Sequence, residues 1–144
     1  MPRILIADDN PSNAELLDAH LDDPKLNFET KLVHNGADTL ATALDWKPDL
    51  ILLDVMMPKM SGFEVCRRLR ADPATANISV LMVTALDQAN DVEAAVDAGT
   101  DDFITKPINK NELVLRVRAM LDSRHEATPA DRSLAYIGRV QQGL

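Results

Sequence analysis

The amino-acid sequence predicts an α/β fold, in which a parallel β-sheet is covered by helices on both faces. Short apolar runs, typical of buried strands, alternate five times with segments whose apolar residues recur at helical spacing. Several of these runs end in acidic or other polar residues. Because open α/β sheets place their ligands at the carboxyl ends of the strands, the sequence also predicts one functional edge of the sheet.

Composition favours one domain without a nucleic-acid or membrane surface. The chain has 144 residues and 46% hydrophobic content, enough for one core. Its formal net charge of −8 argues against binding to nucleic acid or anionic membranes, which requires clustered Lys and Arg. A single cysteine excludes an internal disulfide, and no apolar run approaches the roughly 20 residues that span a bilayer. Without a signal-peptide pattern, we expect a cytoplasmic location.

The first strand and helix are predicted from the N-terminal residues. The strand covers residues 3–7, and Asn10 is suited to cap a helix whose first turn contains Pro11. This helix is expected to end near Pro24. Its expected apolar face consists of Leu16, Leu17, His20 and Leu21.

The second strand is weaker and is predicted at residues 28–33. An Asn35-Gly36 turn leads from it into a helix that ends at Trp46. The expected inward residues of this helix are Leu40, Ala41 and Leu44.

The central strand is the uninterrupted apolar run at residues 50–53, which ends at Asp54. Ser61 and Glu64 form a predicted capping box for the next helix, with Glu64 reaching back to the free N–H groups. Phe63, Val65, Cys66 and Leu69 are expected to face the sheet, with Cys66 as inert core. Arg67, Arg68 and Arg70 are expected to form a solvated helix face.

The remaining strands are predicted at residues 78–83 and 102–105. Between them lies a helix at 92–98 with Gly99 as its C′ residue, and a final helix opens at Asn109. Its expected apolar face is Leu113, Val114, Val117, Met120 and Leu121. The domain is expected to cover residues 1–122, and residues 123–144 are expected to be a linker or an extra C-terminal helix.

A doubly wound, flavodoxin-like sheet with strand order 2-1-3-4-5 places the first and third strands side by side. In that order Asp8 and Asp9 are neighbours of Asp54. Three clustered carboxylates raise one another's pKa, and a hard cation such as Mg²⁺, which prefers oxygen ligands, resolves this repulsion. Lys106, after the last strand, adds a second positive charge.

An aspartate between a divalent cation and a lysine is well placed to attack phosphorus, since phosphoryl transfer depends on positioning and charge neutralisation. We therefore expect Asp54 to be the nucleophile, with Asp8 and Asp9 as metal ligands. The expected donors to the phosphoryl oxygens are the Thr84 hydroxyl and the backbone N–H groups of Met56 and Ala85.

Four short motifs together resemble the receiver domain of two-component response regulators over about residues 3 to 121. They are Asp8-Asp9, Asp54 with the following Met-Met-Pro, Thr84-Ala85 and Lys106-Pro107. The stretches LLDVMMPKMSGFEVCRRLR, VTALD and DDFITKPIN are similar to those of receivers at the N-terminus of diguanylate-cyclase response regulators.

The resemblance implies a phosphorylation-controlled switch in a phosphorelay, and not an enzyme. Asp54 would accept a phosphoryl group from the phosphohistidine of a histidine kinase or histidine phosphotransfer protein. Mg²⁺ would be held by Asp9, Asp54 and the Met56 carbonyl, with Asp8 contributing through water, and Lys106 would pair with the phosphoryl group.

The resemblance also implies an output surface made of the fourth helix, fifth strand and fifth helix. Phe103 would be the switch aromatic that turns inward when Thr84 moves, and the Lys106-Pro107 bond would be cis. Bulky Met56 and Leu86 are expected beside the phosphoryl group, where they would hinder an attacking water. The cognate kinase, the downstream output and a homodimer stay open.

Three other functions are weighed against the switch. A Mg²⁺-dependent aspartyl-phosphate phosphatase of the haloacid-dehalogenase kind carries a second aspartate two residues after the nucleophile, where this chain has Met56. A flavin or dinucleotide domain lacks support because no G-x-G-x-x-G follows the first strand. A constitutive interaction module would lack the acceptor or the lysine, and both are present. The histidines, at positions 20, 34 and 125, form no ligand spacing and are expected to be structural or solvated.

Overall fold

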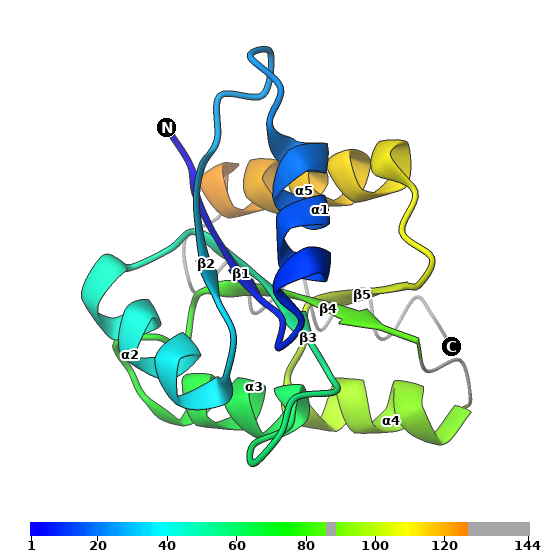
Figure 1. Cartoon of the computed structure of the whole chain (residues 1–144). Coiled ribbons are helices and arrows are strands. Elements are labelled where there is room, and N and C mark those ends of the chain that lie inside the picture. Colours follow the sequence, from blue (N-terminus) through cyan, green and yellow to red (C-terminus); the bar gives the residue numbers. More distant parts are fainter. Residues whose placement is uncertain (86–88, 127–144) are drawn as a thin grey trace, which may run out of the picture.

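The structure, a computed structural model, describes residues 1–85 and 89–126 and has alternating strands and helices throughout (Figure 1). The elements are β1 (Arg3–Ala7), α1 (Pro11–Leu21), β2 (Glu29–Val33), α2 (Gly36–Trp46), β3 (Leu50–Asp54), α3 (Gly62–Ala71), β4 (Ser79–Thr84), α4 (Ala89–Ala98), β5 (Asp102–Thr105) and α5 (Lys110–Glu126). None of the described helices is long and apolar enough to cross a membrane.

The five strands form one parallel sheet in the order β2-β1-β3-β4-β5, which confirms the predicted flavodoxin-like order. Helices α1 and α5 cover one face, and α2, α3 and α4 cover the other (Figure 1). The central strand β3 is buried along its whole length. Its uninterrupted apolar sequence follows from this position, because both of its faces lie under helices.

Each strand divides its side chains between two hydrophobic clusters, because successive residues point to opposite faces. In β1, Leu5 and Ala7 join the cluster that packs against α2, α3 and α4, whereas Ile4 and Ile6 join the cluster beneath α1 and α5. All four residues are at most 1% exposed. The sheet is therefore held from both sides, and its strand ends are left to form a rim.

The prediction for the apolar face of α1 was wrong in part. Leu16 is 55% exposed, and the buried stripe is Ala14, Leu17 and Leu21. These residues follow the i, i+3, i+7 spacing of one helix face, and Leu16 lies about 100° around the helix from Leu17. The prediction favoured the large apolar Leu16, whereas the small Ala14 occupies the buried position.

The predicted face of α2 was also wrong in part, since only Leu40 of the three predicted residues packs against the core. Ala41 and Leu44 are exposed, and the buried residues are Gly36, Thr39, Ala43 and Trp46. Thr39 is fully buried because its hydroxyl donates to the Asn35 carbonyl at 2.7 Å, which satisfies the polar group within the helix. Thr39, which was not among the predicted inward residues, therefore occupies a core position of α2.

The capping box predicted for α3 is only half present. The Ser61 hydroxyl accepts from the Glu64 backbone N–H at 3.3 Å, as expected. The Glu64 carboxylate does not reach back, and instead pairs with Arg67 and Arg68, each at 3.1 Å. On the opposite side of the helix Cys66 is fully buried, and burial raises the pKa of its thiol to about 11, as fits inert core.

Arg70 contradicts the prediction of a solvated helix face. Its guanidinium donates to the backbone carbonyls of Ala76, Ile78 and Gly99 and to the carboxylate of Asp101. Its side chain is only 22% exposed. Arg67 and Arg68 do lie on the exposed side of α3, as predicted.

Helix α4 begins three residues before the predicted 92–98 segment and ends at Ala98. Gly99 has the left-handed φ of +88° expected of a C′ residue. Helix α5 continues to Glu126, beyond the predicted domain boundary at residue 122. Residues 127–144 lie outside the described residues, so a linker or an extra helix there stays a prediction.

Candidate phosphoacceptor site

The carboxyl ends of four strands meet at one rim, as the strand order predicts. Asp8 and Asp9 follow β1, Asp54 is the last residue of β3, and Lys106 follows β5. Strand pairing explains this, because Ala7 is opposite Leu53 in the register and the next residues of both strands are the acids. One oxygen from each of Asp8, Asp9 and Asp54 lies within 4.8 Å of the others.

Asp54 is a buried carboxylate with a raised pKa. Its side chain is 5% exposed, and its Oδ1 lies 3.6 Å from Lys106 Nζ and 3.4 Å from the Met56 backbone nitrogen, which donates to it. Burial and then the charge of Asp8 raise the pKa of Asp54 to about 6, against the opposing influence of Lys106. Asp54 is therefore mostly ionised at neutral pH, although burial and the charge of Asp8 disfavour its ionised form.

Asp8 is fully buried, and only one of its two carboxylate oxygens accepts a hydrogen bond within the described residues. Its Oδ1 accepts from the Asn10 backbone N–H at 2.9 Å, whereas its Oδ2 has no hydrogen-bond partner among the described residues and lies 3.8 Å from Lys106 Nζ. A buried carboxylate oxygen without a donor is costly unless a cation binds it. Asp8 therefore offers an oxygen that a cation other than Lys106 can bind at this rim.

The donor set fits Mg²⁺. It consists of carboxylate oxygens, the hard ligands that Mg²⁺ prefers, and it includes the buried Asp8 Oδ2. Asp9 is exposed, so the cluster opens to solvent on its side and can admit an ion that keeps several waters. Lys106 alone leaves a net negative charge on the three carboxylates.

Replacing Asp9 with asparagine is expected to weaken Mg²⁺ binding by about tenfold or more, because one of the charged oxygen ligands is lost. Isothermal titration calorimetry measures this affinity. Asp45→Asn, a matched change at an exposed position on α2, is the control and is expected to bind Mg²⁺ as the wild type does. Equal affinities for the wild type and Asp9→Asn would contradict the assignment of the site.

Thr84 and Ala85 lie at the neighbouring strand end. Thr84 is the last residue of β4 and is 6% exposed, whereas Ala85 is exposed. The Lys106 backbone N–H donates to the Thr84 carbonyl at 2.7 Å, which ties the end of β5 to the end of β4. The Lys106-Pro107 peptide bond is cis, as the resemblance implied.

The side chains of Phe103 and Met56 differ in their exposure to solvent. Phe103, in β5, is partly buried and packs against the cluster beneath α2, α3 and α4. The Met56 side chain is 65% exposed, and Leu86, its predicted companion, lies outside the described residues.

Two residues at the rim escaped sequence reasoning as parts of the site. Gly62 places the start of α3 against β3, and its N–H donates to the Val55 carbonyl at 2.9 Å. His34, just after β2, has its Nδ1 3.0 Å from the Asp8 backbone oxygen, which fits its expected structural role. Two features of the sequence could have pointed to these residues. They are the Ser61-Gly62 pair at the start of α3 and the place of His34 directly after a predicted strand.

The fold and this rim define a class of protein, a phosphoacceptor switch with an acidic site for Mg²⁺. Residues 4–118 match the family described as the response regulator receiver domain. The chain belongs to this family. Receiver domains are phosphorylated by histidine kinases, and this places the chain in two-component signalling.

Two curated relatives illustrate the similarity. The DNA-binding dual master transcriptional regulator RpaA of Synechocystis sp. is 46% identical over 121 residues, which are 84% of this chain and 49% of RpaA. The response regulator PleD of Caulobacter vibrioides is 45% identical over 118 residues, which are 82% of this chain and 26% of PleD. The chain therefore spans about half or less of these relatives' length.

Solved structures support the same assignment. The signal receiver domain of a histidine kinase from Syntrophus aciditrophicus superposes with a TM-score of 0.81 at 34% identity, covering 90% of this chain and 96% of that domain. The receiver domain of the Pseudomonas aeruginosa sensor kinase PA1611 has a TM-score of 0.76 at 27% identity and covers 84% and 98%. That structure holds a magnesium ion in its active-site cleft.

Proposed function

We propose that Asp54 is the phosphoacceptor of this receiver, with Asp8, Asp9, Asp54 and the Met56 carbonyl as the Mg²⁺ ligands. The observation that carries the proposal is the placement of one buried carboxylate, 3.6 Å from an ammonium group and within 4.8 Å of two further acids. Asp54 is preferred to Asp8 and Asp9 because it ends the central strand and its Oδ1 lies near both Lys106 Nζ and the Met56 N–H. Mg²⁺, when bound, neutralises the carboxylates and offers further coordination positions to phosphoryl oxygens.

In the transfer, an Asp54 carboxylate oxygen forms a bond to the phosphorus of a donor phosphohistidine. The phosphorus–nitrogen bond breaks, and its electron pair returns to the histidine nitrogen of the donor. Lys106 neutralises part of the charge on the phosphoryl oxygens, and the backbone N–H groups of Met56 and Ala85 donate to them.

Peptide mass mapping of the phosphorylated chain tests the assignment of Asp54. The phosphoryl group is expected on the peptide that contains Asp54. A phosphoryl group on the N-terminal peptide with Asp8 and Asp9 would contradict the assigned roles.

The switch follows from the change in charge at the rim. A phosphoryl group adds about −1.5 to −2 charge near Thr84, whose hydroxyl is suited to donate to it. Movement of Thr84 toward Asp54 opens space next to Phe103, which already packs partly against the core. The inward rotamer of Phe103 is favoured because its ring has no hydroxyl to satisfy on burial. The expected output surface is α4, β5 and α5.

Met56→Asn is expected to shorten the lifetime of the phosphorylated state. The exposed thioether side chain follows the acceptor by two residues and hinders an attacking water, whereas an amide can hydrogen-bond that water. The decay of the phosphorylated protein, followed by intact mass over time, measures the lifetime. An unchanged lifetime in Met56→Asn and in the double variant with Leu86→Glu would contradict this role.

The rival functions find less support at this site. An aspartyl-phosphate phosphatase needs an acid two residues after the nucleophile, and Met56 has no ionisable group. A constitutive module would have no use for a buried acceptor beside Lys106. Phosphate release that continues for many cycles with a small phosphodonor would favour the phosphatase.

The output and the partners are a separate proposal. By its likeness to receivers of diguanylate-cyclase regulators, we assign the chain to the control of a cyclase, with a histidine kinase or phosphotransfer protein as donor. The relatives do not distinguish control of a cyclase from control of transcription, because RpaA and PleD are almost equally identical to this chain, at 46% and 45%. Sequencing the transcript beyond Leu144 tests the proposal, and a DNA-binding domain there would overturn it.

Size-exclusion chromatography of the phosphorylated chain tests whether it forms a homodimer.

A further inference from the structure

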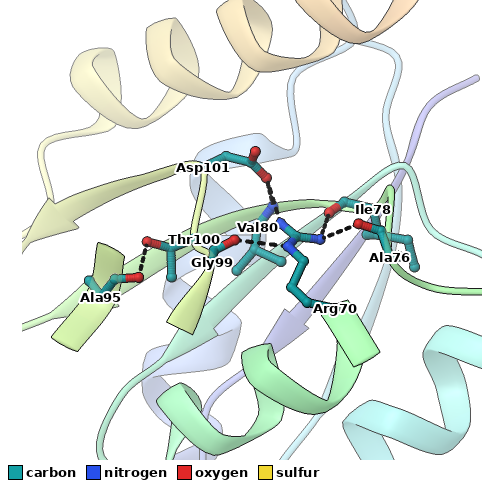
Figure 2. Close-up of polar contacts among 8 residues, drawn as sticks. All are labelled: Arg70, Ala76, Ile78, Val80, Ala95, Gly99, Thr100 and Asp101. Carbon is teal, nitrogen blue, oxygen red and sulfur yellow. Dashed lines mark hydrogen bonds and ion pairs between the residues drawn. The ribbon is translucent and has the colours of Figure 1, made fainter. Parts of the chain in front are cut away.

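Arg70 ties three elements together at the end of the sheet opposite the acidic rim. Figure 2 shows its side chain reaching from the last turn of α3 toward the start of β4 and the turn between α4 and β5. Its Nε donates to the Gly99 carbonyl at 2.8 Å, and one terminal nitrogen donates to Ala76 and Ile78 at 3.0 and 2.6 Å. The other terminal nitrogen pairs with Asp101 at 2.9 Å. We call Arg70, Gly99, Thr100 and Asp101 the bracket.

Asp101 extends the bracket into the sheet. Its backbone N–H donates to the Val80 carbonyl at 3.0 Å, and its carboxylate accepts from the Val80 N–H at 2.8 Å as well as from Arg70 (Figure 2). The Asp101 side chain is 25% exposed, so these charge-assisted bonds are partly shielded from solvent. The segment after α4 is therefore fixed to both β4 and α3.

The last turn of α4 is closed on the same segment. The Gly99 N–H donates to the Val96 carbonyl and the Thr100 N–H to the Ala95 carbonyl, which is the Schellman arrangement. The Thr100 hydroxyl also donates to Ala95 at 2.9 Å (Figure 2). A Cβ on Gly99 would lie 3.0 Å from Arg70 Cγ, so the side chain of Arg70 packs directly on this turn.

Within residues 93–98, the part of α4 whose side chains are described, two alanines are buried. Ala95 and Ala98 are 4% and 2% exposed, whereas Val96 is 54% exposed. Alanine contacts are shallow and do not interlock strongly, so they allow one helix to turn against a neighbour. The polar bonds of the bracket therefore add to these alanine contacts in holding the C-terminal end of α4.

The other end of α4 is connected to the phosphoacceptor rim. Thr84 ends β4, and α4 begins at Ala89 only five positions later. The helix has ten residues, so about 15 Å separates its two ends. A displacement that starts at Thr84 enters α4 at the end remote from the bracket.

We propose that the bracket is a pivot, so that phosphorylation turns α4 about Gly99 and moves its N-terminal end while its C-terminal end stays in place. The inference rests on the proposed role of Asp54 as phosphoacceptor. Arg70 acts in it as a positioning residue that has no contact with the reacting atoms. Its function is to confine the movement to the part of α4 that adjoins the rim.

Amide hydrogen exchange, read by mass spectrometry, tests the pivot. The wild type, Arg70→Met and Arg67→Met are compared with and without acetyl phosphate and Mg²⁺, and intact mass verifies the phosphoryl group in each sample. In the wild type and in Arg67→Met, phosphorylation is expected to change exchange at residues 89–94 and to leave 95–101 unchanged. In Arg70→Met, the change is expected to extend through 95–101. Arg67→Met is matched because it removes an exposed arginine from the same helix.

Three results would overturn the pivot. One is a phosphorylation-dependent change at 95–101 in the wild type, and another is no extension in Arg70→Met. The third is the same extension in Cys66→Ala, which destabilises α3 from its buried face without touching the bracket. Asp101→Asn, which keeps an acceptor for Val80 but removes the ion pair, replaces Arg70→Met if the latter does not fold. A wild type that gains no phosphoryl group and releases no phosphate from acetyl phosphate refutes the proposed acceptor, and its mass distinguishes this outcome from a failure of the pivot alone.

Discussion

Replacing Asp54 with asparagine is expected to stabilise the metal-free protein at pH 7 by about 2 kcal/mol, after allowance for solvent screening at the open rim. The physical reason is the pKa of Asp54, which burial and the neighbouring Asp8 raise from 3.8 to about 6. The folded chain therefore holds this proton more tightly than the unfolded chain does. Ionising Asp54 costs free energy that an amide of the same shape avoids.

The sign of this effect fixes its pH window. Below pH 3.8 the carboxyl is protonated in both states and Asp54 carries no penalty. Between pH 3.8 and about 6 the wild type loses stability because the unfolded chain ionises while the folded chain still holds the proton, and above that range both states are ionised and the loss is complete. The advantage of Asp54→Asn is therefore expected to vanish near pH 4 and to be full at pH 7.

Urea denaturation in EDTA at a series of pH values measures both effects. Asp45→Asn, on the exposed side of α2, is the control and is expected to follow the wild-type profile. Mg²⁺ is expected to stabilise the wild type more than Asp54→Asn, since it binds the ionised carboxylate. Parallel pH profiles for the wild type and Asp54→Asn would contradict a raised pKa at this position.

Gly62→Ala is expected to lower the free energy of unfolding by about 3 kcal/mol, the upper end for overpacking a core. A Cβ at this position would overlap the Asp54 backbone oxygen and would lie 3.0 Å from the Val55 Cα. These are backbone atoms of the strand end that carries the acceptor, so they cannot rotate away. Either α3 or the Asp54 carbonyl must move.

Gly36→Ala is the matched control for this change. Its Cβ would meet only side-chain atoms of Met60 and Val65, at 2.9 Å and 3.0 Å, and these can shift more readily than a backbone. Urea denaturation of both variants is expected to show the larger loss for Gly62→Ala. A loss in Gly62→Ala no greater than that in Gly36→Ala would show that the close approach of α3 to β3 is not required.

The sheet and its rim followed from the sequence because their signals are local. Each apolar run marked a strand, and the residue type at its end marked the rim, so the positions of Asp8, Asp54 and Lys106 required only the strand order. The acids and the lysine do meet, since Lys106 Nζ lies 3.8 Å from Asp8 Oδ2 and 3.6 Å from Asp54 Oδ1. The residue roles within that rim remain proposals.

The errors arose where a helix uses small or polar residues for packing. In α1 and α2 the buried stripes contain Ala14, Thr39 and Ala43, so a count of large apolar residues favoured Leu16 and Leu44, which are exposed. A hydroxyl that bonds within its own helix, as in Thr39, cannot be recognised before the backbone is known.

Arg70 shows a different limit. Its spacing from Arg67 and Arg68 gave no signal that it differed from them, because its partners are backbone carbonyls and an acid 31 positions along the chain. Backbone acceptors leave no mark in the sequence. Only the folded chain shows that a residue expected in solvent joins α3, β4 and the end of α4.

The intact mass of the chain after incubation with acetyl phosphate and Mg²⁺ tests the central claim most directly. The wild type is expected to gain one phosphoryl group only when Mg²⁺ is present, and Asp54→Ala is expected to gain none under the same conditions. If the wild type gains no group and releases no phosphate from the donor, or if Asp54→Ala is modified to the same extent, then Asp54 is not the acceptor of this receiver.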